Sequence, residues 1–217
     1  MRGRIKLLVA AATGLALLAV VAPVATSAAS ATTCTDTLAP GSYQSVVVPA
    51  GASCLSAGPV TINGGVSIGA GATFVLGSED NPVPTGRING GVHASGAASV
   101  QIHFSTINGG IDVHGGAGPF GGPFDITWNT IEDSQINGTV TIEGYNGFWM
   151  GFIRNHVNGT VNLNNNVLMD PDGNEYVTNS INGNLNCSGN SPAPQIGDSE
   201  GSPNQVNGRK TGQCTGV

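Results

Sequence analysis

One seven-residue phrase recurs along the chain and limits the fold more than any other feature of the sequence. Its first copy is Ile62-Asn63-Gly64-Gly65-Val66-Ser67-Ile68. The later copies begin at Ile88, Ile107, Ile136, Val157 and Ile181, and a shorter copy is Val206-Asn207-Gly208. Their asparagines follow one another at intervals of 26, 19, 29, 21, 24 and 25 residues. A period of about 24 residues is typical of a stacked solenoid in which each copy belongs to one coil.

The phrase itself predicts a strand, a sharp corner and a second strand. Asn-Gly is expected to supply positive φ angles for the corner, because glycine lacks the side chain that would clash there. The pair is also typical of a β-hairpin, but a series of hairpins would not explain the period. If each copy is one coil, the asparagine side chains form a ladder along the axis and the strands form parallel sheets.

The alternation within the phrase assigns the faces of these strands. Relative to each asparagine, positions −1, +3 and +5 are apolar in almost every copy, so we expect them to point inward. About seven coils at a spacing of ~4.8 Å would form a rod ~35 Å long. The sequence therefore predicts an all-β protein, a right-handed parallel β-helix of about seven coils.

The ends of such a rod would expose unpaired strand edges, so caps are required. We expect an N-terminal cap over residues 31–58 and a C-terminal cap over residues 188–217. The four cysteines are Cys34, Cys54, Cys187 and Cys214, and they allow three disulfide connectivities. The two local pairs are favoured, because the first two and the last two cysteines bracket opposite ends of the rod. Each bridge would stabilise the fold by ~3 kcal/mol.

Residues 1–30 are typical of a secretory signal peptide. Arg2, Arg4 and Lys6 precede an apolar run from Leu7 to Val21, and small residues follow. The interpretation predicts a secreted, extracellular chain with one domain, residues 31–217, and no membrane span after processing. Four basic residues then remain against thirteen acidic ones, a net charge of about −9. This charge argues against nucleic acid and anionic membranes as partners.

The repeat and its asparagine ladder, over Val46 to Gly208, resemble the right-handed β-helix proteins of the pectate-lyase-like superfamily, in particular small secreted members of the actinobacterial type. The resemblance implies the fold and says little about function. Pectin hydrolases of this type carry Asn-Thr-Asp, Asp-Asp, Gly-His-Gly and Arg-Ile-Lys motifs. This chain has Asn129-Thr130-Ile131 and lacks the other three. The clustered aspartates with which pectate lyases bind calcium are also missing.

We therefore expect a secreted, non-catalytic β-helix scaffold or binding protein, associated with carbohydrate or the cell envelope and without a cofactor. One alternative is a polysaccharide lyase or glycoside hydrolase that uses the polar face of coils 2–4. A second alternative is an ice-binding or adhesive surface protein.

That polar face arises because stacking places His93, Asp112, His114 and Glu143 on three consecutive coils. These side chains offer the nitrogen and oxygen donors that a divalent metal accepts, so all four are candidate metal ligands. Asp112 and Glu143 are the candidate catalytic residues of the enzyme hypothesis. The alternative is a solvated surface on which polar residues pair across strands.

The segment after Glu143 contains three aromatic residues, Tyr145, Phe148 and Trp149. Tyr145 and Trp149 are candidate binding residues together with His93 and His114, because an exposed aromatic ring can stack on a sugar. The alternative is that both rings fill a wide coil. The acidic pairs Glu79-Asp80 and Glu132-Asp133 are not catalytic dyads in this interpretation, because adjacent residues on a strand point to opposite faces.

Overall fold

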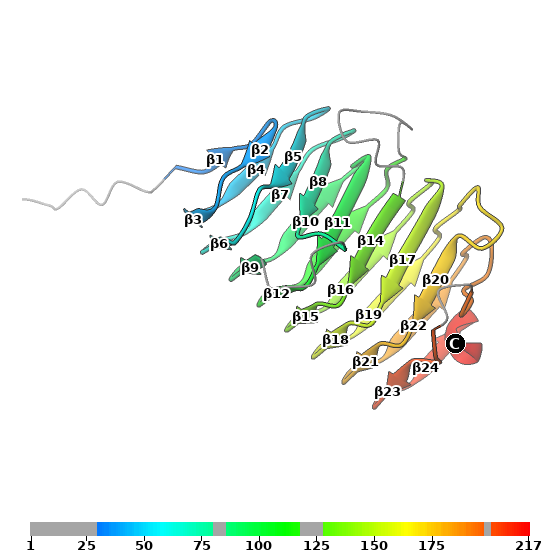
Figure 1. Ribbon diagram of the computed structural model, residues 1–217. Coiled ribbons are helices and arrows are strands. Elements are labelled where there is room, and N and C mark those ends of the chain that lie inside the picture. The colour runs from blue at the N-terminus through cyan, green and yellow to red at the C-terminus, as the bar shows by residue number, and fades with distance from the viewer. Residues whose placement is uncertain (1–29, 80–85, 118–127, 198–200) are drawn as a thin grey trace, which may run out of the picture.

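The computed structural model describes residues 30–79, 86–117, 128–197 and 201–217. The chain winds into a parallel β-helix whose strands form three parallel sheets (Figure 1), with nine, seven and eight strands in the described residues. This confirms the predicted solenoid. The predicted signal peptide lies outside the described residues apart from Ser30. In the described part of the chain, no helix is long and apolar enough to cross a membrane.

In each sheet the strands follow one another along the rod in chain order. Sheet A contains β1 (Thr32–Thr33), β4 (Val46–Val48), β7 (Val66–Ile68), β10 (Val92–Ser95), β13 (Ile111–His114), β16 (Val140–Glu143), β19 (Val161–Asn164), β22 (Leu185–Ser188) and β24 (Lys210–Gly212). Sheet B contains β2 (Thr37–Leu38), β5 (Ser53–Ser56), β8 (Thr73–Leu76), β11 (Ser99–His103), β14 (Trp128–Glu132), β17 (Trp149–Ile153) and β20 (Asn174–Val177). Sheet C contains β3 (Gly41–Tyr43), β6 (Val60–Ile62), β9 (Gly86–Ile88), β12 (Ser105–Ile107), β15 (Gln135–Ile136), β18 (His156–Val157), β21 (Ser180–Ile181) and β23 (Gln205–Val206). A short 3-10 helix, η1 (Gln213–Gly216), ends the chain.

The hydrophobic core lies between the three sheets and contains the residues that the alternation predicts. Positions −1, +3 and +5 of the first copy, Ile62, Val66 and Ile68, are buried. The same positions are buried in the next five copies. In the last copy, near the end of the rod, they are only partly buried or exposed.

The predicted asparagine ladder is confirmed along the exposed edge where sheet C turns into sheet A. Each amide nitrogen donates a hydrogen bond to the amide oxygen one coil earlier, from Asn89 Nδ2 to Asn63 Oδ1 (3.5 Å) through to Asn207 Nδ2 to Asn182 Oδ1 (2.7 Å). The four intermediate bonds measure 2.7–2.8 Å.

The predicted reason for the glycine in each Asn-Gly corner is wrong. None of the seven Asn-Gly pairs of the repeat has a positive φ. Glycine is required there because successive coils approach too closely for a side chain. A Cβ added to Gly109 would lie 2.6 Å from the carbonyl carbon of Gly90. A Cβ added to Gly138 would lie equally close to Gly109.

Residues with positive φ mark a different corner, between sheets B and C. Phe104, Asp133, Arg154 and Thr178 have φ values from 46° to 60°. Each stands four residues before an asparagine of the repeat. The residue that follows each of them is a serine or asparagine, which points into the rod.

These inward residues form a second, buried ladder of Ser105, Ser134, Asn155, Asn179 and Asn204. In this ladder a side-chain oxygen accepts a hydrogen bond from the backbone N–H one coil earlier, as Asn155 Oδ1 does from Ser134 N–H at 3.1 Å. Its amide also donates to Ile131 O at 2.7 Å. The ladder thus satisfies backbone groups inside the rod that water cannot reach.

Both predicted disulfides are present and tie the two ends of the rod. Cys34 bonds to Cys54 and Cys187 bonds to Cys214, across 20 and 27 residues. All four side chains are buried within the core. The bridges therefore tie the two ends of the rod to its core.

Replacing Gly109 by alanine is expected to destabilise the protein by about 1–3 kcal/mol, because the added methyl group overpacks the corner. Equilibrium urea unfolding followed by circular dichroism measures the difference. The control is Gly216→Ala, because a Cβ at Gly216 meets no atom within 4 Å. Equal stability of Gly109→Ala and wild type would contradict the close-approach argument.

The two ladders are expected to differ in their contribution to stability. Asn155→Ala leaves buried backbone groups without partners and is expected to cost about 3 kcal/mol. Asn137→Ala, in the exposed ladder, is expected to cost less than about 1 kcal/mol, because water replaces its partners. The same unfolding measurement compares the two variants, and a larger cost for Asn137→Ala would refute this assignment.

Candidate functional site

The structure brings together three of the four residues of the predicted polar face on sheet A. His93 on β10 is in register with Asp112 on β13. The Asp112 carboxylate lies between two imidazoles, with its Oδ1 2.9 Å from His114 Nε2 and its Oδ2 3.7 Å from His93 Nδ1. The His93, His114 and Asp112 side chains are 66%, 52% and 44% exposed. The group is therefore accessible to a ligand from solvent.

The fourth residue, Glu143, is directed elsewhere. Its backbone is in register with His114, but its Oε1 accepts a hydrogen bond from Asn165 Nδ2 at 3.1 Å. Among the described residues, the three side chains whose metal-ligating atoms lie within 4.8 Å of one another are instead those of Glu79, His103 and Glu132, on the side of sheet B. His93, Asp112, His114 and Glu143 thus do not form the predicted four-residue metal cluster.

His93, Asp112 and His114 line one side of a groove of about 530 Å³. The groove crosses four coils of sheet A, and its other lining residues are small or apolar: Val47, Val48, Pro49, Ala50, Ser67, Ile68, Gly69, Ala94 and Ser95. The surface thus combines an apolar part with hydrogen-bonding groups on one edge, as ligand sites commonly do.

The predicted binding residue Tyr145 belongs to the core. Its side chain is fully buried, and its hydroxyl donates to Ala98 O at 3.1 Å. Burial also raises the pKa of this phenol. The chain turns inward after Gly144, whose φ is 73°, so the ring fills the coil and is not available to a ligand. The alternative of a core-filling tyrosine is therefore the correct one.

The other predicted aromatic residue, Trp149, is half-buried on sheet B, in register with Trp128 one coil earlier. It lies on sheet B, whereas His93 and His114 lie on sheet A, and it does not line the groove of sheet A. The predicted binding set is thus reduced to the two histidines on sheet A.

A cluster that the sequence analysis missed lies on the outer face of sheet B. In β11, Gln101 and His103 alternate with the core residues Val100 and Ile102, so they point away from the core. They are nevertheless only 5% and 2% exposed. His103 Nδ1 lies 2.9 Å from Glu132 Oε1 and 4.0 Å from Glu79 Oε1.

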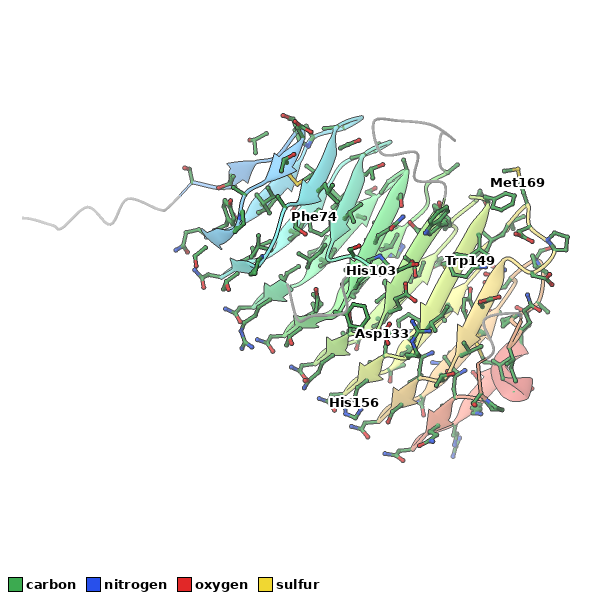
Figure 2. All side chains as sticks on the ribbon, in the orientation of Figure 1. Phe74, His103, Asp133, Trp149, His156 and Met169 are labelled. Atoms are coloured by element: carbon green, nitrogen blue, oxygen red, sulfur yellow. A yellow bond between two sulfur atoms is a disulfide. The ribbon has the colours of Figure 1, made fainter. Side chains whose placement is uncertain are left out.

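Arg154, from the next coil, also belongs to this charged cluster. Figure 2 labels two of its residues, His103 and Asp133. Its Nη2 donates to Glu132 Oε2 at 3.0 Å, and its Nε and Nη2 donate to the two oxygens of Asp133 at 2.8 and 2.6 Å. The interpretation that Glu132 and Asp133 point to opposite faces is wrong, because Asp133 has a φ of 50° and turns its carboxylate toward the same arginine.

The pKa of Glu132 reflects these neighbours. Burial raises the pKa of this carboxyl group, but its close polar contacts with His103 and Glu79 and the charges of His103 and Arg154 lower it, and the net pKa lies below the ordinary value. Glu132 is therefore held as a carboxylate in a buried position.

A second groove, of about 340 Å³, opens beside this cluster. Its lining includes Glu79, Gln101, His103 and Trp128. The sequence did contain a signal for part of this site. His103 precedes Glu132 by the same 29 residues that separate the corresponding asparagines, Asn108 and Asn137.

Comparison with known proteins identifies no relative: no family model, curated protein or solved structure matches this chain. The resemblance to pectate-lyase-like proteins thus rests on the repeat alone.

Proposed function

We propose that this chain is an extracellular, non-catalytic binding protein that holds an uncharged polysaccharide in the groove of sheet A. The observation that carries the proposal is the Asp112 carboxylate between His93 and His114, at the edge of a groove of about 530 Å³. Sugars combine apolar C–H faces with hydroxyl groups. The small, apolar lining suits the former, and the three polar side chains suit the latter.

The shape of the groove favours a chain-like ligand. Its lining residues come from β4, β7, β10 and β13 and from the turns that follow β4 and β7. Strands that are neighbours in a sheet lie about 4.8 Å apart. A groove across four strands is therefore long enough to contact several sugar units in succession.

The lining also favours binding over cleavage. Glycoside hydrolysis generally requires two carboxyl groups on either side of the scissile bond. Among the described residues that line this groove, Asp112 is the only one with a carboxyl group. Glu143, the second candidate catalytic residue, is bound by Asn165 outside it.

The net charge supports an uncharged ligand, and the disulfides support an extracellular location. The whole chain carries a formal net charge of −6, which disfavours acidic polysaccharides as ligands. The two disulfides are compatible with an extracellular location, because such bonds persist in oxidising compartments.

The test is a binding assay of the processed chain against a panel of neutral and acidic polysaccharides. At least one neutral polysaccharide is expected to bind, and Asp112→Asn is expected to weaken it by about tenfold or more, since a hydrogen bond to a charged group contributes about 1.5–3 kcal/mol. Affinity electrophoresis, or calorimetry with soluble oligosaccharides, measures the change.

Glu143→Gln is the matched control, because Glu143 lies one coil further on the same face but outside the groove. It is expected to bind as wild type does. Equal losses in both variants, or no binding to any neutral polysaccharide, would refute the proposed site. If the wild-type protein cleaves a polysaccharide and Asp112→Asn does not, the protein is an enzyme and not a binding protein.

A further inference from the structure

The cluster on sheet B contains two buried polar atoms that are not satisfied by hydrogen bonds. His103 Nδ1 and Glu132 Oε1 face each other at 2.9 Å, but neither forms a hydrogen bond of acceptable geometry. The His103 and Glu132 side chains are only 2% and 7% exposed. Buried polar atoms of this kind are few in folded proteins, and an ion is one of the groups that satisfy them.

The other ring nitrogen of His103 indicates the state of this pair. His103 Nε2 lies 3.3 Å from the side-chain oxygen of Gln101, which can only accept a hydrogen bond. Nε2 therefore carries the proton, and in a neutral imidazole Nδ1 then carries a lone pair. A 2.9 Å contact between this nitrogen and the carboxylate oxygen is favourable only when a cation, either a proton on Nδ1 or a metal ion, lies between the two atoms.

We propose that Glu79, His103 and Glu132 bind a divalent transition-metal ion, with Zn²⁺ as the best fit. Their three donor atoms lie within 4.8 Å of one another. Two ligands of a tetrahedral zinc ion, at 2.0–2.1 Å from the metal, are separated by about 3.3 Å. The distances from His103 Nδ1 to the two glutamates, 2.9 and 4.0 Å, lie on either side of that value.

The donor types and the surrounding charges also suit such an ion. An imidazole nitrogen favours zinc and related metals over calcium and magnesium, which prefer oxygen ligands alone. Arg154 occupies the other oxygen of Glu132 and both oxygens of Asp133. Two carboxylates, those of Glu132 and Asp133, thus share one guanidinium, and a divalent cation bound at Glu132 would reduce the negative charge that remains.

The arrangement leaves one coordination position open toward solvent. Glu79 and His103 line the groove of about 340 Å³, so a water molecule or a ligand donor can supply the fourth ligand of the ion. Three protein ligands with an open position are typical of zinc sites that bind a further molecule. This site lies on sheet B, and the proposal does not depend on the polysaccharide groove of sheet A.

The test is calorimetric titration of the processed, chelator-treated chain with Zn²⁺ at neutral pH. One ion per chain is expected to bind, and Ca²⁺ is expected not to compete. Glu79→Gln is the principal variant, because the Glu79 side chain is 57% exposed and its replacement leaves the buried pair in place. It is expected to lower the zinc affinity by about tenfold or more, since even residues that only orient a metal ligand contribute 10–100-fold.

Three further measurements complete the test. His103→Gln is expected to abolish the site, with circular dichroism to check that the variant folds. His156→Ala, on β18 of sheet C, is the matched control and is expected to bind zinc as wild type does. The Co²⁺-substituted protein is expected to show the visible absorption of a four-coordinate site, and Glu79→Gln is expected to alter it. No zinc binding, unchanged affinity in Glu79→Gln, or equal affinity for Ca²⁺ would overturn the proposal.

Discussion

The whole rod depends on how closely one coil can approach the next at the Asn-Gly corner. Backbone hydrogen bonds connect successive corners directly, from Gly90 N–H to Gly64 O at 2.8 Å and from Gly109 N–H to Gly90 O at 3.0 Å. Any side chain on these glycines would separate the coils. The corner lies between the strands of sheet C and sheet A, so its spacing sets the register of both sheets. On both sides of the corner, apolar and polar residues alternate along the strands, and the apolar ones form the core.

The fold could be predicted because its determinants recur at fixed distances from one residue. The repeat asparagine fixes the core at positions −1, +3 and +5, and this pattern survives coils of different length. The buried ladder stands at a fixed distance too, at position −3. It was not predicted, because alternation places position −3 inside the rod, where apolar residues are expected. A buried serine or asparagine can be explained there only when its hydrogen-bond partner on the neighbouring coil is known.

The two sites differ in how far sequence reasoning could reach them. His93, Asp112 and His114 follow the repeat at short, constant offsets, so their proximity could be predicted. His103 and Glu132 both stand five residues before a repeat asparagine, and counting backward from it would have paired them. Glu79 follows β8 and has no such offset, so its approach to His103 depends on the path of a connection that the period does not fix. Tyr145 was misjudged because nothing local distinguishes a ring that fills a coil from one that lies outside.

The exposed asparagine ladder has a direction, and this gives the rod a polarity. Backbone hydrogen bonds between coils run both ways, as Val66 N–H to Gly91 O and Asn89 N–H to Ile62 O illustrate. In all six amide–amide hydrogen bonds of the exposed ladder, the donor lies on the later coil and donates toward the N-terminal end. Aligned amide dipoles polarise one another, so their partial charges accumulate at the two ends. One edge of the molecule is therefore a line of parallel dipoles, positive at the first coil and negative at the last.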